Sequence, residues 1–383
     1  MSDPKNAIIV GRRRQEERMT LVLSDEDVAR VHPMADCIEA METAYRDHAL
    51  SGAVNIPRIR YISPTTDADK VYGSNIHIGT TPSYDAAAIR IGGSARSTKP
   101  NAQGERSPKF DNRNWGFIVL IDMQTGRPLA FIHEFYLSGI RVGATSGVAA
   151  KYLAPPGAQT VGMFGSGKLA RTDLEALVQV RTVRSVKVYS PTKEHREEFA
   201  SEMSQQLEVE VTPVDNPREA MEGTEIVCCA TNAGYVSGKP VFDGDWLEPG
   251  QFVISLQNSD ANFKKSEVDD TTFARSAFIC INDRDSVYSN NQIELLDPIE
   301  QGLVSWDRIC TLGEVVAGTT ALEAQPGDIV YYKNSTGMGI QMAAAGALIY
   351  RKAVEAGVGH EIPTEWFGSD LTYWYDKGFY PSA

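Results

Sequence analysis

A glycine-rich segment near the middle of the chain has the residue types and spacing of a dinucleotide-binding turn. Gly165, Gly167 and Ala170 form a G-x-G-x-x-A pattern, which follows an apolar strand-like run and opens a helical one. Gly165 would make the tight turn, Gly167 would let the backbone approach a pyrophosphate, and Ala170 would let the helix pack closely on the sheet. Because the N-terminus of a helix attracts negative charge, the pattern predicts dinucleotide binding. An ordinary tight turn between a strand and a helix is the alternative.

The end of the next predicted strand bears on the choice of nucleotide. NAD-selective domains usually place an acidic residue there to hold the ribose hydroxyls. This chain has Ser190, Thr192 and Lys193 instead, which would not repel a 2′-phosphate and could bind one. We therefore favour NADP slightly, with NAD left open. Lys193 could equally be a solvated cation at the start of a helix.

These residues need a parallel sheet to position them, and the middle of the chain predicts one. Short apolar runs alternate with polar helical stretches, the pattern of strands joined by right-handed helical crossovers. Strands are expected over 160–164, 186–189, 208–212, 226–230, 252–256 and 277–281, with helices over 168–180, 193–206 and 217–222.

The two ends of the chain have a different texture. Ser24 could cap a short helix that starts at Asp25, and apolar residues recur at helical spacing over 34–50. Strands of an antiparallel or mixed sheet are expected over 58–62, 75–79, 87–92 and 115–122, a loop over 94–114, and helices over 137–152 and 337–356. Residues 1–18 look like a disordered extension, and 383 residues suggest more than one domain.

Composition narrows the functional class. The net charge of −13 and the pI of about 5.0 argue against nucleic-acid binding, which needs clustered cations. The five cysteines include no C-x-x-C pair, which favours a reducing compartment without a disulfide framework. No apolar stretch approaches the length of a membrane span, and none of the six histidines has metal-site or triad spacing. We expect a cytoplasmic enzyme without a metal.

Four ordered segments resemble the ornithine cyclodeaminase/μ-crystallin family. Residues 117–130 read FIVLIDMQTGRPLA, residues 137–146 read LSGIRVGATS, the glycine turn follows, and residues 332–340 read YKNSTGMGI. The resemblance covers about residues 19–357. It implies a homodimer whose subunits have a Rossmann NAD(P)-binding domain, expected over 137–330. A mixed-sheet α+β domain for substrate binding and dimerisation would be built from 19–136 and 331–383.

The resemblance also implies roles for three arginines. A small α-imino or α-amino acid needs its carboxylate held, and a guanidinium does this bidentately. Arg58 resembles the carboxylate-binding arginine of the family, and Arg141 would lie near both cofactor and substrate. Arg90 stands where the family usually has a lysine that can move a proton, which a guanidinium does poorly. We therefore expect Arg90 to bind an anion at the catalytic site. For Arg58 the alternative is a solvent-exposed cation on a surface strand.

Asp260 is the carboxylate available at the position of the family's catalytic aspartate, and it could exchange a proton with the substrate nitrogen. Its register is open, because the spacing to Glu267 is one residue longer than usual. A second departure is Gln341-Met342, where the family commonly has an acidic pair. Thr336 is a further expected substrate contact. The expected cofactor contacts are Arg113, Arg141, Thr145, Gly165, Ser166, Gly167, Lys168, Leu169, Ser190, Thr192, Lys193, Thr231, Asn258 and Ser335.

The sequence thus predicts an NAD(P)-dependent imine reductase or amino-acid dehydrogenase, with hydride exchanged at the α-carbon. Two alternatives stay open. The chain could be a cyclodeaminase-type ammonia lyase that uses the cofactor transiently, or a binding protein that keeps the nucleotide without turnover. Arg90 counts against the first alternative, and Arg90 and Met342 together keep the second open.

Overall fold

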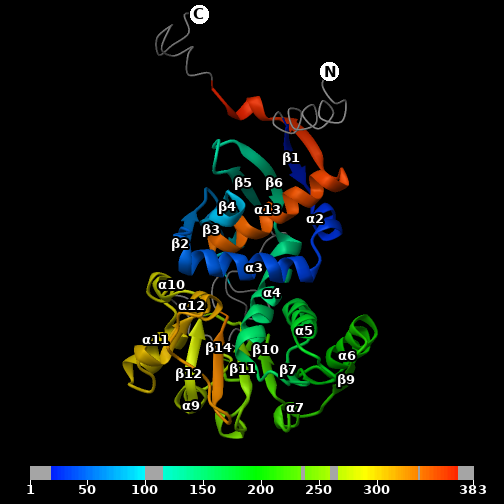
Figure 1. Ribbon diagram of the computed structural model, residues 1–383, viewed down its shortest axis with the longest axis vertical. Helices are drawn as coiled ribbons and strands as arrows, with labels where there is room; N and C mark the ends of the chain where they lie inside the picture. Colours follow the sequence, from blue (N-terminus) through cyan, green and yellow to red (C-terminus); the bar gives the residue numbers. More distant parts are fainter. Residues whose placement is uncertain (1–18, 100–114, 234–237, 259–265, 335–336, 370–383) are drawn as a thin grey trace, which may run out of the picture.

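The computed structural model describes residues 19–99, 115–233, 238–258, 266–334 and 337–369. The strands form two sheets, which lie one above the other in Figure 1 with helices between them. The upper sheet is built from both ends of the chain, and the lower sheet from the middle. The expected mixed sheet and parallel sheet are therefore both present.

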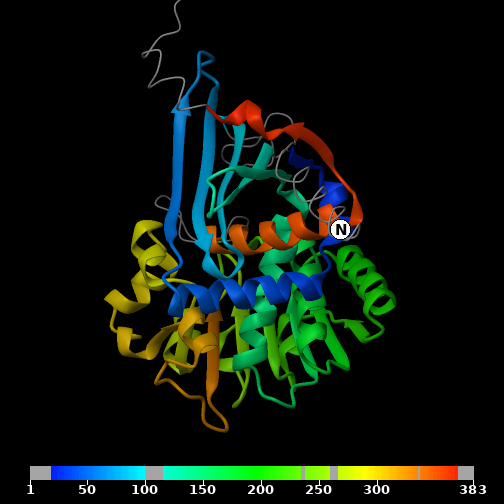
Figure 2. The same ribbon diagram turned by 45° about the horizontal axis from the view of Figure 1, so that its top comes forward.

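The upper sheet has seven strands in the order β15-β1-β6-β5-β4-β3-β2. β1 and β6 are parallel, and every other neighbouring pair in this sheet is antiparallel. Figure 2 shows β2 and β3 as a long hairpin that extends beyond the rest of the sheet. The strands are β1 (Met19–Leu23), β2 (Asn55–Pro64), β3 (Lys70–Thr81), β4 (Ala86–Ser97), β5 (Trp115–Asp122), β6 (Pro128–His133) and β15 (His360–Pro363).

Helices α3 (Met34–Leu50) and α13 (Gly339–Ala356) run side by side beneath this sheet (Figure 2). The start of α13 touches β3 backbone to backbone. A Cβ on Gly339 would lie 2.0 Å from the carbonyl oxygen of Ile78, and a Cβ on Gly79 would lie 2.3 Å from the nitrogen of Ile340. Only glycine permits this approach, which sets the short distance between the start of α13 and β3. The preceding short helix α2 (Asp25–Val31) begins with a capping box made by Ser24 and Asp27.

The lower sheet has eight strands in the order β13-β12-β14-β11-β10-β7-β8-β9, and all its neighbouring pairs are parallel. Its strands are β7 (Thr160–Phe164), β8 (Ser185–Tyr189), β9 (Glu210–Pro213), β10 (Ile226–Cys229), β11 (Phe252–Ser255), β12 (Ser276–Ile281), β13 (Ile309–Thr311) and β14 (Ile329–Lys333). The helices of this half are α4 (Phe135–Leu153), α5 (Lys168–Val180), α6 (Lys193–Leu207), α7 (Pro217–Met221), α9 (Asp270–Arg275), α10 (Arg284–Ser289), α11 (Ile293–Glu300) and α12 (Leu312–Ala317).

Apolar residues form two core clusters. The larger cluster runs from the upper sheet through α3, α4 and α13 to one face of the lower sheet, and the smaller cluster covers the other face of the lower sheet. All five cysteines are free and buried: Cys37 on α3 belongs to the helical layer, and Cys228, Cys229, Cys280 and Cys310 lie on strands of the lower sheet. Burial raises the pKa of the Cys228 and Cys229 thiols.

Some expectations about the fold need correction. The segment expected as a loop from Ser94 onward is still strand as far as Ser97, because the β3–β4 pairing continues to that residue. β1, β6, β13, β14 and β15 were not anticipated as strands. Their runs are short, and each pairs with a strand distant in the sequence, although β6 also pairs with β5 directly before it. The extension expected over 1–18 lies outside the described residues.

In the part of the chain that the structure describes, no helix is long and apolar enough to cross a membrane. The same residues contain no group of three or more His, Cys, Asp or Glu side chains that could hold a metal ion.

Candidate functional site

A cavity of about 970 Å³ opens at the carboxyl ends of β7, β8 and β10. In parallel sheets this edge is where ligands bind, next to the point where strand order reverses. Here β7 is the first strand of the sheet in chain order and lies between β10 and β8. From β7 the chain adds β8 and β9 on one side and then β10 and β11 on the other. The cavity is lined by Gly165, Ser166, Gly167, Lys168, Leu169, Arg171, Tyr189, Ser190, Thr192, His195, Thr231 and others.

The glycine turn fits a dinucleotide. Gly165 has a φ of +105°, and a Cβ there would lie 2.3 Å from the carbonyl oxygen of Ala230, so the position needs glycine for both reasons. A Cβ on Gly167 would meet nothing within 4 Å, which leaves open space before the first turn of α5. An open backbone at a helix N-terminus is the arrangement that receives a pyrophosphate. The residues of this turn therefore fit the dinucleotide that the sequence predicts.

The end of β8 carries two small hydroxyls and no acid. Ser190 Oγ lies 3.0 Å from Ser166 Oγ, and Thr192 and His195 also line the cavity. Lys193 is not among the lining residues; its side chain is 65% exposed, with Nζ 3.7 Å from a Glu197 carboxylate oxygen. Buried Arg196 donates to the Ser190 carbonyl and pairs with Asp215, so it supports the turn from behind.

Two cations at the start of α5 are engaged with the protein. The Lys168 ammonium donates to the Phe135 carbonyl oxygen at 2.6 Å and lies over the Phe135 ring. Arg171, which the sequence analysis missed, donates to the Ser166 and Gly167 carbonyls and pairs with Glu202. Both line the cavity, so each can face a bound nucleotide.

Buried Glu267 joins the loops that follow β10 and β11. Its carboxylate accepts from the Thr231 amide and hydroxyl at 2.6 and 2.8 Å, and from the Leu256 and Gln257 amides at 2.8 and 2.9 Å. Burial raises the pKa of Glu267, and the Lys333 ammonium and these donors oppose the rise. Thr231, an expected cofactor contact, is thereby held on the cavity wall.

A second cavity, of about 190 Å³, adjoins the first, and Leu169 lines both. It lies between β2, β3 and β4 of the upper sheet, the middle of α4, and the ends of β11 and β14. The three expected arginines, Arg58, Arg90 and Arg141, all line it. The other lining residues are Asn75, His77, Val142, Leu169, Leu256, Asn258, Asn334 and Gly337.

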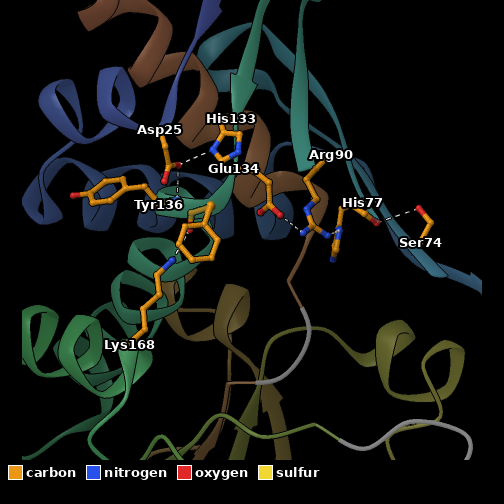
Figure 3. A network of polar contacts seen from close by, with 10 residues as sticks. Asp25, Ser74, His77, Arg90, His133, Glu134, Tyr136 and Lys168 are labelled. Atoms are coloured by element: carbon orange, nitrogen blue, oxygen red, sulfur yellow. Dashed lines mark hydrogen bonds and ion pairs between the residues drawn. The ribbon is translucent and has the colours of Figure 1, made fainter. Parts of the chain in front are cut away.

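Arg90 is held by side chains on both sides. One terminal nitrogen, Nη2, lies 2.5 Å from Glu134 Oε1, and the other, Nη1, lies 3.4 Å from His77 Nδ1 (Figure 3). Glycines make room for the ion pair: a Cβ on Gly92 would be 2.7 Å from Arg90 Nη2, and a Cβ on Gly116 would be 2.6 Å from Glu134 Oε1. The pair is nearly buried, with side-chain exposures of 12% for Arg90 and 2% for Glu134.

Arg141 reaches the cavity from α4 and meets a neutral partner. Its Nη1 donates to Gln341 Oε1 at 3.1 Å, and the Gln341 amide donates to the Tyr45 and Thr145 hydroxyls, each at 3.0 Å. Burial lowers the pKa of Arg141, and nearby Arg90 lowers it further. Thr145 is buried and lines neither cavity, and its hydroxyl donates to the Arg141 backbone carbonyl at 2.7 Å.

Arg58 enters from β2, where its Nε donates to Asn290 Oδ1 at 3.2 Å. Asn258 lines the same cavity. Four expected residues, Arg113, Asp260, Ser335 and Thr336, lie outside the described residues.

Sequence reasoning missed His77, Glu134 and Asn334. His77 pairs directly across from Arg90 on the neighbouring strand. Asn334 follows β14 and donates to the Val142 carbonyl and the Ser146 hydroxyl at 3.0 and 2.9 Å, which ties the end of β14 to α4. A strand-pairing register would have found His77, but no local motif marks Glu134 as the partner of Arg90.

Known proteins resemble this chain over most of its length. A Δ1-pyrroline-2-carboxylate reductase of Bacillus cereus is 30% identical over 250 residues, 64% of this chain and 74% of that relative. The iminosuccinate reductase of Paracoccus denitrificans is 26% identical over 89% of this chain and 99% of its own length. A solved structure of the Thermococcus litoralis Δ1-pyrroline-2-carboxylate reductase, in complex with NADH and L-proline, has a TM-score of 0.76 and 28% identity. It covers 90% of this chain and 100% of that one.

The match to a family model extends further than any single motif and includes every strand of both sheets except β15. It runs from residue 18 to residue 357, and therefore includes the glycine turn and the three arginines of the second cavity. The resemblance predicted from four sequence segments is confirmed, and the chain belongs to the ornithine cyclodeaminase/mu-crystallin family.

Proposed function

We propose that this protein is an NAD(P)-dependent oxidoreductase that acts on the C–N bond of a small α-imino or α-amino acid. The observation that carries the proposal is the pairing of two cavities across Leu169. One has the glycine turn and the size for a dinucleotide, and the other is small and lined by three arginines. Relatives that reduce cyclic and acyclic imino acids support the same class of reaction.

The residues of the small cavity suit a carboxylate beside a reacting carbon. Arg58 approaches from β2 and Arg141 from α4, and the two would hold the substrate carboxylate. Nicotinamide bound in the large cavity would supply or accept the hydride at the α-carbon. Arg90, fixed by Glu134, adds positive charge, but its guanidinium stays protonated near neutral pH and so transfers protons poorly. Asp260 remains our proposal for the acid–base group at the substrate nitrogen.

For the cofactor, Ser190 and Thr192 leave the 2′-position of an adenosine ribose without a repelling acid, so NADP stays slightly favoured. The absence of a pocket-lining cation at Lys193 weakens that preference, and NAD remains the alternative. We also propose a cytoplasmic location, in keeping with the five free cysteines.

A homodimer is proposed from the outer face of the upper sheet. α3 and α13 cover the inner face, whereas Ile59, Ile76, Ile91 and Phe117 pair in register across four strands on the outer face. Ile59 and Phe117 are 44% and 42% exposed. Contiguous apolar surface of this kind marks a protein interface. An Ile59→Lys variant should run as a monomer in light-scattering chromatography, and an unchanged mass would rule this face out.

The division into domains also remains a proposal: 19–136 and 331–383 for substrate and dimerisation, and 137–330 for the nucleotide. β14 (Ile329–Lys333) crosses the boundary and pairs within the lower sheet, so the second boundary is better drawn after Lys333.

The test is a spectrophotometric screen at 340 nm. Purified protein is mixed with NADPH or NADH and with preformed cyclic imino acids, or with 2-oxo acids plus ammonia or methylamine. Consumption of reduced cofactor with one of them is the expected result, and the same assay ranks the two cofactors. Arg351→Met, an exposed arginine on α13 far along the helix from the cavity, is the matched control for the cavity arginines.

Two outcomes would overturn the proposal. Ammonia release from ornithine without net change at 340 nm would establish a lyase. Nucleotide binding without turnover on any member of the panel would establish a binding protein.

A further inference from the structure

The contact between Arg90 and His77 fixes where the imidazole carries its proton. A guanidinium has five N–H donors and no acceptor, so His77 Nδ1, 3.4 Å from Arg90 Nη1, can only accept. A neutral imidazole that accepts at Nδ1 carries its hydrogen on Nε2. The ring therefore has one defined tautomer, with an N–H donor at the far nitrogen.

The position of Arg90 is in turn fixed by Glu134. The ion pair between them lies in the room left by Gly92 and Gly116, and any side chain at either glycine would displace it. Glu134 belongs to the start of α4, whereas Arg90 and His77 belong to neighbouring strands β4 and β3. Three elements thus converge to orient one imidazole, as Figure 3 shows.

The surroundings also keep this imidazole uncharged. Arg90 faces it from β4, Arg58 and Arg60 from β2, and Arg141 from α4. Glu134 pairs with Arg90 on the side of the guanidinium away from the His77 contact atom, through Nη2 rather than Nη1. Burial and these cations hold the pKa of His77 well below its usual range. His77 is 4% exposed, and it lines the small cavity together with Arg58 and Arg141.

We propose that Glu134 and Arg90 are positioning residues for His77, whose Nε2–H donates a hydrogen bond to an acceptor atom of the bound substrate. His77 is thereby a specificity-determining residue and a neutral donor among cations. This inference rests on the proposed function only in taking the occupant of the small cavity to be an imino or amino acid. The tautomer is a property of the protein alone.

A neutral donor has a use that another cation would lack. Arg90 already repels Arg141, and after burial this repulsion is a further cause that lowers the pKa of Arg141. A further charge would increase the repulsion before substrate binds, whereas a neutral N–H adds direction without charge. It would favour substrates that present a correctly placed oxygen, because a mismatched ligand would leave this donor unsatisfied.

The first test is nuclear magnetic resonance of the full chain labelled with ¹⁵N-histidine. The His77 signals are assigned by their loss in His77→Phe, with His360→Phe as the control for an exposed histidine. We expect a single Nε2–H tautomer that does not titrate between about pH 5.5 and 8. In Arg90→Met, His77 should lose that fixed tautomer and titrate closer to the usual histidine range, about 6.5. A wild-type His77 that carries its proton on Nδ1, or becomes cationic near pH 6.5, would overturn the proposal.

The second test is kinetic, on the substrate that the 340 nm screen identifies. His77→Phe keeps the ring and removes the donor, so KM should rise about tenfold with kcat within about threefold. His77→Gln, which returns an N–H near the Nε2 position, should recover most of that loss. Glu134→Gln should raise KM and also mix the His77 tautomers, a signature that a purely structural role would not produce. An unchanged KM in His77→Phe contradicts the proposal.

If the screen finds no turnover, the probe is pyrrole-2-carboxylate, a flat and non-reducible mimic of a cyclic imino acid. Its binding should shift the His77 Nε2 resonance of the wild-type protein, and His77→Phe should weaken it about tenfold. Binding with no shift and no loss of affinity would reject the role of His77, whatever the fate of the proposed reaction.

Discussion

The two cavities are built by opposite means. The large cavity owes its form to backbone: a glycine at a φ of +105°, an open helix N-terminus and loops that a buried carboxylate ties together. The small cavity owes its form to charged side chains from the upper sheet and α4, which other side chains orient. A site made of backbone depends on shape, and a site made of side chains depends on charge. The two should therefore fail in different ways when they are altered.

The largest effect is expected from a buried carboxyl group on α5, the helix that begins at the large cavity. Asp173 on α5 is fully buried, and burial raises its pKa to about 7. The pKa of Asp173 is higher in the folded protein than in the unfolded chain. Its contribution to the free energy of unfolding is therefore complete below about pH 4 and is lost as pH rises through 7. The side chain of Asp173→Asn does not titrate, so the variant escapes this loss. Its free energy of unfolding relative to wild type should therefore be about 3 kcal/mol greater at pH 8 than at pH 5. Denaturant unfolding at both values measures this difference, and a gain that is equal at the two would show that Asp173 is not protonated.

The next largest effect concerns charge in the small cavity. Arg141→Met removes one of the two expected carboxylate anchors, and truncating a buried charged contact costs about 2–5 kcal/mol. We expect kcat/KM to fall by about a hundredfold or more, while nucleotide affinity changes by less than about threefold. Steady-state kinetics with fluorescence titration of NADPH separates the two. Equal losses in both quantities would mean that the cavities do not divide the work.

Shape in the large cavity is the third point of attack. Gly165→Ala forces a side chain into a left-handed backbone conformation and against the Ala230 carbonyl, so nucleotide binding should weaken by about thirtyfold, or about 2 kcal/mol. Gly157→Ala, where a Cβ meets nothing within 4 Å, is the control and should bind like wild type. Isothermal titration measures both proteins, and tight binding by Gly165→Ala would show that the turn can relax.

The smallest effect is expected at the rim. Lys193 is exposed and its nearest acid, Glu197, is only a loose partner, so Lys193→Ala should change stability and NADH affinity by less than about 0.5 kcal/mol. A preferential loss of NADPH affinity beyond about tenfold would instead place Lys193 on the 2′-phosphate. The same titration, run with each nucleotide, decides between these results.

The difference between the cavities also explains what could be predicted from the sequence. β7, the glycine turn and α5 are adjacent in the chain, so their geometry follows from local rules of turns, caps and periodicity. The predicted bounds 160–164 and 168–180 coincide with the observed elements. The parallel sheet followed from the same alternation. Even Lys193, correctly placed at the start of α6, could not be aimed from sequence, because its rotamer depends on its neighbours.

The small cavity depends on pairings that no local pattern determines. Arg90 meets Glu134 across 44 residues and Arg141 meets Gln341 across 200, and the register of β3 against β4 brings His77 to Arg90. The three arginines were found through resemblance, which carries such long-range information indirectly. His77 was missed because only that register brings it to Arg90, and Glu134 was missed because its pairing with Arg90 depends on how α4 packs against β4.

The burial of all five thiols turns the cysteines into reporters of local opening. Cys37 belongs to the helices under the upper sheet, whereas the other four lie on strands of the lower sheet. A thiol-specific alkylating reagent can reach each of them only when its own layer opens. Mass spectrometry measures the rate of modification at each cysteine. These rates would therefore show which half of the molecule opens more readily by local unfolding, without any engineered probe.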